Sequence, residues 1–204
     1  MFFSFDGVDG VGKSTQMDLF CQWLRQCGHD VVTCRDPGST PLGEKIRAIL
    51  LQSGPETSIG RLSEMLLYMA ARAQLVEEII APALSDGRMV VSDRYLLANV
   101  VYQAHAGGLD VDATWQVGEV AIAGVEPDLV FLLDMSPDDA LQRLNRAKDR
   151  MEQQTDDFRA RLRAGFLAEA ARRPEQIAVI DAGRTIEAVQ ADIVAAAERL
   201  LFEA

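Results

Sequence analysis

The sequence predicts an α/β fold in which a five-stranded parallel sheet is flanked by helices. Short runs rich in β-forming residues recur along the chain, and segments with helical periodicity separate them. Such alternation is typical of parallel strands joined by crossover helices. The strands are expected at residues 2–6, 30–34, 88–92, 128–134 and 176–181.

The first strand leads directly into a phosphate-binding loop. Residues 7–14 read Gly-Val-Asp-Gly-Val-Gly-Lys-Ser and fit the pattern G-x-x-x-x-G-K-[ST]. The glycines let backbone N–H groups point inward, and the following helix directs its positive end at the same anion. A glycine-rich turn that only joins strand to helix is the alternative. The ATP-binding residues expected here are Gly7, Val8, Asp9, Gly10, Val11, Gly12, Lys13, Ser14 and Thr15.

The second and third strands end in charged residues at the same edge of the sheet. Asp93 ends an apolar strand, where its carboxylate can hold Mg²⁺ through water opposite the Ser14 hydroxyl. Arg35 and Arg94 add two guanidinium groups, whose forks match phosphate oxygens. The alternative is that each arginine pairs with an adjacent acid, Asp36 or Asp93. A second cationic cluster beside a phosphate loop favours a second phosphate, and therefore an acceptor site.

The remaining segments suggest one domain over residues 1–204. Residues 58–84 have apolar positions at helical spacing and are expected to form a long core helix that ends near Pro82. The polar stretch at about residues 145–157 interrupts two helical patterns. It is either a solvated helix junction or a short lid with basic residues over the phosphates.

The histidines bear on the class of reaction. A kinase that phosphorylates a phosphate monoester uses an oxygen that is already largely anionic at neutral pH, whereas a hydrolase must activate water. His29 and His105 are the only histidines, and neither follows a predicted strand. Both are expected to be structural, which favours phosphoryl transfer by positioning and charge neutralisation.

The amino-acid composition limits the kinds of partner and the cellular compartment that are expected. The chain has 20 Lys and Arg against 31 Asp and Glu, a formal net charge of −11. An acidic surface repels nucleic-acid polymers, so none is expected as a partner. The three cysteines lack a C-x-x-C spacing and are expected to be free thiols. No apolar run reaches the roughly 18 residues of a membrane span, so a cytoplasmic protein is expected.

The ordered set of motifs resembles bacterial thymidylate kinases, a family of P-loop nucleoside monophosphate kinases, along essentially the whole chain. The resemblance implies transfer of the γ-phosphoryl group of ATP to dTMP, with Mg²⁺ bridging the nucleotides. The motifs that carry it are residues 7–15, Arg-Asp-Pro-Gly-Ser-Thr at 35–40, Leu-Tyr-Met-Ala-Ala-Arg-Ala-Gln at 67–74, Asp-Arg-Tyr at 93–95, Tyr-Gln at 102–103, Pro-Asp-Leu at 127–129, Leu-Asp at 133–134 and Asp-Arg at 149–150.

The resemblance also implies roles for single residues. Tyr68 stacks on thymine and Arg72, one helical turn later, hydrogen-bonds a base carbonyl. Gln103 contacts the base edge, while Asn99 and Tyr102 line the sugar. Asp9 orients the 3′-hydroxyl and the phosphate-binding arginines. The implied dTMP-binding residues are Asp9, Arg35, Tyr68, Arg72, Arg94, Asn99, Tyr102 and Gln103.

The phosphate loop has no arginine, so the resemblance implies that the lid supplies the catalytic one. The implied catalytic residues are Lys13, Asp9, Arg94, Arg150 and Arg146, and the implied metal ligands are Ser14 and Asp93. Arg184 is expected either near adenine or in an exposed salt bridge. The chain departs from the family pattern at Asp36, Ser39 and Ala98, where glutamate, glycine and serine are common.

The sequence leaves open the identity of the acceptor, the alternative of a different functional class, and the oligomeric state. The acceptor could be dUMP or dCMP, because one methyl group is worth only roughly 1 to 3 kcal/mol of discrimination. A nucleotide-dependent switch that hydrolyses ATP slowly is the alternative from another functional class. The resemblance implies a homodimer packed through helices. Its face could include Val117, Val120, Ala121 and Ile122, which could equally be core residues.

Overall fold

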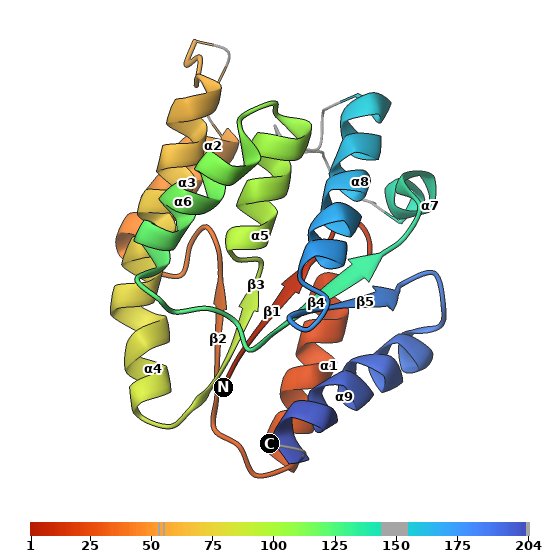
Figure 1. Ribbon diagram of the computed structural model, residues 1–204. Coiled ribbons are helices and arrows are strands. Elements are labelled where there is room, and N and C mark those ends of the chain that lie inside the picture. Colours follow the sequence, from red (N-terminus) through yellow and green to blue (C-terminus); the bar gives the residue numbers. More distant parts are fainter. Residues whose placement is uncertain (53, 55, 144–154, 203–204) are drawn as a thin grey trace.

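Five parallel strands form the centre of the molecule (Figure 1). The structure, a computed structural model, describes residues 1–52, 54, 56–143 and 155–202. The sheet has the order β2-β3-β1-β4-β5, and every neighbouring pair is parallel. The predicted strands are confirmed within one residue at each end. Their bounds are β1 (Phe2–Asp6), β2 (Val31–Arg35), β3 (Met89–Asp93), β4 (Leu129–Asp134) and β5 (Ile177–Asp181).

The central strands are buried on both faces, as their continuous apolar runs predict. All five residues of β1 are buried, whereas the edge strand β2 alternates between buried and more exposed positions. Phe3, Phe5, Phe20 and Phe131 form an aromatic cluster with ring centroids 4.9 to 5.8 Å apart. Burying each ring stabilises the fold by roughly 1.5 to 3 kcal/mol. The core therefore fixes β1, and with it the loop that follows.

Helices cover the sheet and carry the rest of the site (Figure 1). The first and last helices, α1 and α9, pack against each other and against the sheet, and α4 and α8 contact strands β3, β4 and β5. The helices are α1 (Lys13–Gln26), α2 (Pro41–Gln52), α3 (Arg61–Leu75), α4 (Ala81–Ser85), α5 (Leu96–Asn99), α6 (Val111–Ile122), α7 (Pro137–Gln142), α8 (Asp156–Arg172) and α9 (Ile186–Phe202), with π-helical segments η1 (Val76–Ile80) and η2 (Val100–Ala106).

The long helix predicted at residues 58–84 is present, but a π-helical segment interrupts its α-helical hydrogen bonding. It begins at Arg61 as α3, widens into the π-helical segment η1, and ends as α4 at Ser85. Segment η1 lies directly before Pro82, which has no N–H to donate to the helical ladder. Apolar periodicity predicts the helix but does not distinguish a π turn from an α turn.

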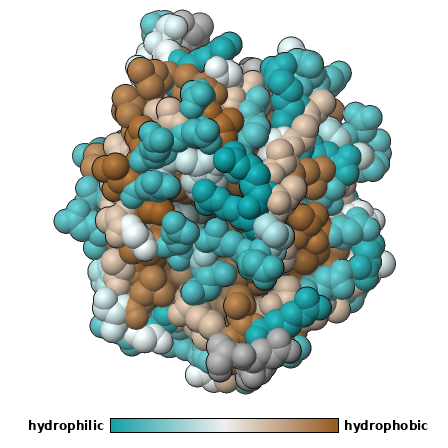
Figure 2. Space-filling view, in the orientation of Figure 1, coloured by the Kyte–Doolittle hydropathy of each residue, from teal (hydrophilic) through white to brown (hydrophobic). Residues whose placement is uncertain are grey.

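The surface in Figure 2 mixes hydrophilic and hydrophobic residues, with hydrophobic ones gathered on the side of α3, α4 and α6. Leu62 and Leu66 of α3 are 59% and 48% exposed, and Val120 of α6 is 82% exposed. Ile122 is buried in the core, while Val117 and Ala121 are partly buried against it. Among the described helices, none is long and apolar enough to cross a membrane. The three cysteines are free, as predicted.

Candidate active site

A cavity of about 740 Å³ opens at the carboxyl edge of the sheet, where parallel α/β sheets bind ligands. Its volume is in the range typical of small-ligand sites. The predicted residues that it brings together are Asp9, Gly10, Val11, Gly12, Lys13, Ser14, Thr15, Arg35, Tyr68, Arg72, Asp93, Arg94, Asn99, Tyr102, Gln103 and Arg184. Gly7 and Val8 are not among the lining residues, but both bond the lysine of the loop.

The phosphate loop is held from within by its lysine. Lys13 Nζ donates to the carbonyl oxygens of Gly7 at 3.1 Å and Val8 at 2.9 Å. Gly7 has φ +134°, and a Cβ there would lie 2.4 Å from the Leu133 carbonyl oxygen, so only glycine fits. Burial, with Arg94 nearby, lowers the pKa of Lys13. The lysine is thus pre-positioned inside the cradle before a nucleotide enters.

Arg94 joins the phosphate loop to the acceptor side of the cavity. Its guanidinium donates to Asp9 Oδ1 at 2.5 Å and to the Gly7 carbonyl at 3.1 Å. The Tyr102 hydroxyl donates to Asp9 Oδ2 at 3.2 Å, and Arg94 lies over its ring, 5.1 Å from the centroid. Burial alone would raise the pKa of Asp9, but Arg94 and Lys13 lower it below its usual range. Asp9 is therefore an anion that orients two cations.

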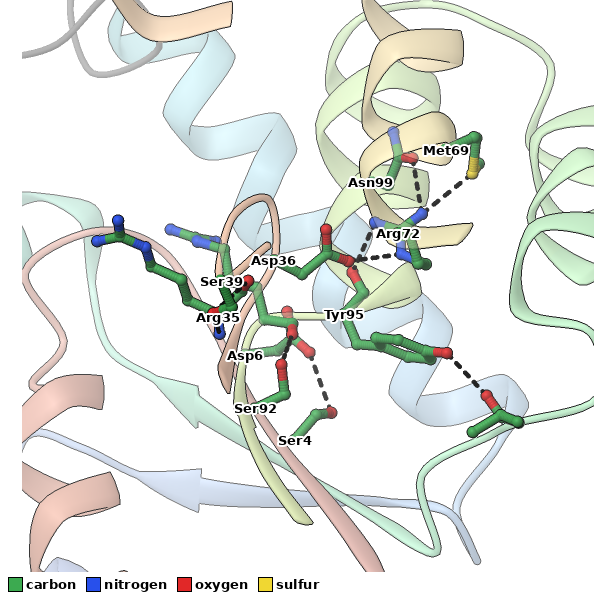
Figure 3. Close-up of polar contacts among 12 residues, drawn as sticks. Ser4, Asp6, Arg35, Asp36, Ser39, Met69, Arg72, Ser92, Tyr95 and Asn99 are labelled. Carbon is green, nitrogen blue, oxygen red and sulfur yellow. Dashed lines mark hydrogen bonds and ion pairs between the residues drawn. The ribbon is translucent and has the colours of Figure 1, made fainter. Parts of the chain in front are cut away.

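Beneath the loop, β1 ends in a fully buried carboxyl group that the sequence reasoning did not single out. Asp6 accepts a hydrogen bond from the Ser4 hydroxyl at 3.4 Å, and its Oδ1 has no partner among the described residues (Figure 3). Burial raises the pKa of Asp6 to about 7, although Arg94 and Lys13 oppose the shift. Its charge therefore changes near neutral pH, directly below the phosphate-binding cations.

Arg35 is paired, but not with the neighbour considered from the sequence. It donates to both carboxylate oxygens of Glu44, at 3.0 and 2.8 Å, and both side chains are about half exposed. Ser39, one of the departures from the family pattern, has φ +66°, and its hydroxyl accepts the Arg35 N–H at 2.9 Å. The Ser39 N–H in turn donates to Glu44. The serine thus fixes the loop that a glycine would leave free.

Buried side chains form the opposite end of the cavity (Figure 3). Arg72 is 1% exposed, and its Nε donates to Asp36 Oδ2 at 2.6 Å. Its Nη1 donates to Asn99 Oδ1 at 3.0 Å. Asp36, which stands where the family pattern commonly has the longer glutamate, still forms an ion pair with Arg72. Burial raises the pKa of Asp36. Here the arginine predicted to bind the base lies in a cluster of buried polar side chains that bond one another.

Asn99 and Tyr102 differ in what they contact. Asn99, expected beside the sugar, bonds Arg72 and also donates through Nδ2 to Gln103 Oε1 at 2.6 Å. Tyr102 instead contacts Asp9 and Arg94 at the phosphate side. Ala98, the third departure, is buried and lines the cavity.

The residues predicted to hold a metal both line the cavity. Asp93 Oδ1 is buried and accepts no hydrogen bond from the described part of the chain, and Ser14 is exposed at the start of α1. No group of three acidic, histidine or cysteine side chains within the described ranges forms a metal cage. Mg²⁺ is commonly held by one or two protein oxygens, water and phosphates, so a hydroxyl and a free carboxylate oxygen fit it.

Two cations in the cavity were not predicted. Arg47, on α2, is partly buried, donates to the Pro37 carbonyl at 2.9 Å and lines the cavity near Arg35 and Tyr68. Arg143 lines the cavity near Arg184 and donates to the Ala182 carbonyl. Neither follows a strand or belongs to a recognisable motif, so the sequence alone had no signal for them.

Three further predictions have mixed outcomes. Arg184 lines the cavity and forms the exposed ion pair that was expected, here with Asp192, while its place near adenine stays a prediction. Neither histidine is among the lining residues, and His105 instead contacts the buried Glu169 at 2.7 Å. Arg146 and Arg150, together with most of the predicted lid, lie outside the described residues.

Comparison with known proteins agrees with this geometry. The family model "Thymidylate kinase" matches residues 5–193. The chain belongs to the thymidylate kinase family. It is 46% identical to a thymidylate kinase of Rhodopirellula baltica over 95% of this chain and 78% of the relative. It is 41% identical to one of Caldanaerobacter subterraneus subsp. tengcongensis, over 98% and 96% of the two chains.

A solved structure supports the same assignment. The crystal structure of thymidylate kinase from Ehrlichia chaffeensis has a TM-score of 0.80 and 28% identity, and the match covers 97% of this chain and 98% of that one. The predicted α/β fold and the predicted thymidylate kinase function are confirmed by these matches. Membership of this kinase family also implies the use of ATP.

Proposed function

We propose that this cavity transfers the γ-phosphoryl group of ATP to dTMP and releases dTDP and ADP. The observation that carries the proposal is one cavity with a phosphate loop, a second set of cations and a buried polar end. The second set is Arg35, Arg47 and Arg94, which gives the acceptor phosphate a place of its own. A nucleotide hydrolase or switch has no use for such a set.

The ATP phosphates occupy the loop and contact its backbone N–H groups. Lys13 exchanges its bonds to the loop carbonyls for the β- and γ-phosphates and stabilises the group in transfer. We assign Arg184, which lines the same cavity, to the neighbourhood of adenine, and Arg143 lies close to it in the lining. Arg146 and Arg150 remain our proposal for the catalytic charge from the lid. Their residues lie outside the described part of the chain.

The acceptor nucleotide lies between the cations and the buried polar end. Arg94 and Arg35 bind its phosphate, with Arg47 adding charge nearby, and Asp9 holds Arg94 while orienting the 3′-hydroxyl. Tyr68 stacks on the thymine ring, and Arg72 donates to a base carbonyl. An acceptor phosphate oxygen is largely anionic at neutral pH, so it needs no general base.

Ser14 and Asp93 are the proposed protein contacts of Mg²⁺, the Ser14 hydroxyl directly and the Asp93 carboxylate through water. When bound, Mg²⁺ would neutralise part of the negative charge of the phosphates. Asp93 Oδ1 is buried and has no hydrogen-bond partner among the described residues, which supports this assignment.

The apolar face of α3 and α6 supports a homodimer. We propose that Leu62, Leu66 and Val120, which are all exposed, pack against a second copy of the chain. Of the residues considered from the sequence, Val120 fits this face best, since Ile122 belongs to the core.

The proposal is tested by measuring ADP release with Mg·ATP and no acceptor, dTMP, dUMP, dCMP or AMP, and by identifying the diphosphate product directly. ADP release that depends on dTMP and yields dTDP is expected. ADP release that is indifferent to every acceptor would indicate a nucleotide hydrolase and overturn the proposal.

A further inference from the structure

A chain of hydrogen bonds continues from Arg72 to a carboxylate outside the main cavity. Asn99 Nδ2 donates to Gln103 Oε1 at 2.6 Å, and Gln103 Nε2 donates to Glu64 Oε1 at 3.0 Å. Glu64 lies in the first turn of α3 and is 9% exposed. It lines a separate cavity of about 270 Å³, and Gln103 lines both this cavity and the main one. Glu64 therefore reaches the nucleotide site through Gln103.

Arg72 and Glu64, at the two ends of this series of hydrogen bonds, determine which group donates in each bond. A guanidinium group only donates and an ionised carboxylate only accepts, whereas an amide can turn and do either. Arg72 Nη1 donates to Asn99 Oδ1, so Asn99 must present its NH₂ group to Gln103. Glu64 must receive the NH₂ group of Gln103, so the Gln103 oxygen faces Asn99. Arg72 and Glu64 therefore require the same orientation of the Asn99 and Gln103 amides.

We propose that Glu64 is a positioning residue that holds the Gln103 amide with its oxygen available to the base edge. The proposal rests on the proposed function. One lone pair of Gln103 Oε1 accepts from Asn99, and a second lone pair remains. Arg72 as donor and Gln103 as acceptor complement a pyrimidine with a carbonyl next to a ring N–H. Thymine and uracil have this pattern, and cytosine, with an amino group and a ring acceptor, has the reverse.

Removing Glu64 releases the outer end of Gln103. Its NH₂ group then loses a buried partner, and the Gln103 side chain, held among the described residues only by Asn99 at its oxygen, shifts from its position beside the base edge. The base edge is affected, while the ATP phosphates contact other residues. We therefore expect Glu64→Leu to raise the KM for dTMP about tenfold, with kcat and the KM for ATP changed less than about threefold. The preference for dTMP over dCMP in kcat/KM should fall about tenfold.

Two variants separate positioning from general damage. Glu64→Gln retains an acceptor oxygen of the same reach and should recover most of the lost dTMP affinity. Glu78→Leu is the control for the same substitution at another carboxylate that accepts from a glutamine amide, because Gln74 donates to Glu78 at 2.5 Å in an exposed pair on the same long helix. Glu78 does not line either cavity within the described chain. Its loss should leave base preference unchanged.

The decisive test is a double-mutant cycle for dTMP KM with Glu64→Leu, Gln103→Leu and both together. If Glu64 acts through Gln103, the double variant is no worse than Gln103→Leu alone. Multiplied effects in the double variant, or equal losses for dTMP and dCMP with a lowered unfolding temperature, would overturn the proposal and assign a structural role. Absence of dTMP turnover by the unaltered protein would overturn the proposed function as well, so the two failures are distinguishable.

Discussion

The two ends of the nucleotide cavity are built differently. At the base end, Arg72, Asn99 and Gln103 are 1 to 3% exposed and bond one another. At the phosphate end, Arg35 and Glu44 are paired with side chains 50% and 43% exposed. The base end is thus assembled by the fold itself. The phosphate end holds Arg35 on an exposed carboxylate, which an incoming phosphate can replace.

The difference follows from the physics of buried polar groups. A guanidinium without partners in a buried site carries a large desolvation penalty, so Arg72 needs Asp36 and Asn99 whether or not a base is present. An exposed pair such as Arg35 and Glu44 is worth only about 0 to 1 kcal/mol, so exchanging it is cheap. Base recognition is therefore pre-organised, whereas binding of the acceptor phosphate by Arg35 is an exchange of ion pairs.

The largest expected effect comes from breaking the base end. Arg72→Met leaves Asp36 buried without its cation, and losing one partner of a buried pair lowers the free energy of unfolding by about 3 to 5 kcal/mol. The KM for dTMP should rise at least tenfold while the KM for ATP is unchanged. Urea unfolding and steady-state kinetics measure both. Equal loss of ATP and dTMP affinity would mean that Arg72 is only structural.

Removing a cation from the phosphate end should affect catalysis instead. Lys13→Met is expected to lower kcat about 10²- to 10³-fold, the loss typical of one electrostatic contact to the transferring group. Stability should change little, because the lysine bonds carbonyls of a loop that stays folded. Arg88→Met, which removes an exposed pair with Asp30, is the control and should leave kcat unchanged. If Lys13→Met lowered the free energy of unfolding but left kcat unchanged, Lys13 would have the structural role that is expected of the base end.

The phosphate end should also make stability depend on pH. The Asp6 carboxyl has a pKa of about 7 in the folded protein, compared with the ordinary value of 3.8 for an aspartate. Folding therefore favours its neutral form. Stability is highest below about pH 4 for this group and declines as pH rises toward 7, by about 2 kcal/mol between pH 5 and 7. Asp6→Asn should remove this decline in urea unfolding. An identical pH slope in both proteins would exclude Asp6 as its source.

The smallest effect is expected where the ion pair is exposed. Glu44→Gln keeps an oxygen for the Ser39 N–H but weakens the competition for Arg35. The KM for dTMP should fall by about threefold or less, with the change vanishing at high salt. Steady-state kinetics at two salt concentrations measure it. A rise in KM would show that Glu44 assists Arg35 rather than competing with the phosphate.

The sequence predicted the strands and the phosphate loop because both depend on local patterns. Apolar runs gave each strand within one residue, and the glycine spacing placed Lys13. The partners of the arginines were not predictable, because Arg35 contacts Glu44 on α2 rather than its sequence neighbour Asp36. Glu64 and Arg47 were missed for the same reason, since only tertiary packing brings them to the site. The residue roles carried over from the family remain predictions.

The crystal structure of the complex with dTMP tests the contrast between the two ends most directly. We expect the bonds from Arg72 to Asp36 and Asn99, and from Gln103 to Glu64, to be retained when the base is bound. Arg35 should leave Glu44 and, with Arg94, contact the acceptor phosphate. A complex in which Arg72 leaves Asp36 while Arg35 stays on Glu44 would show that the base end, and not the phosphate end, rearranges when dTMP binds.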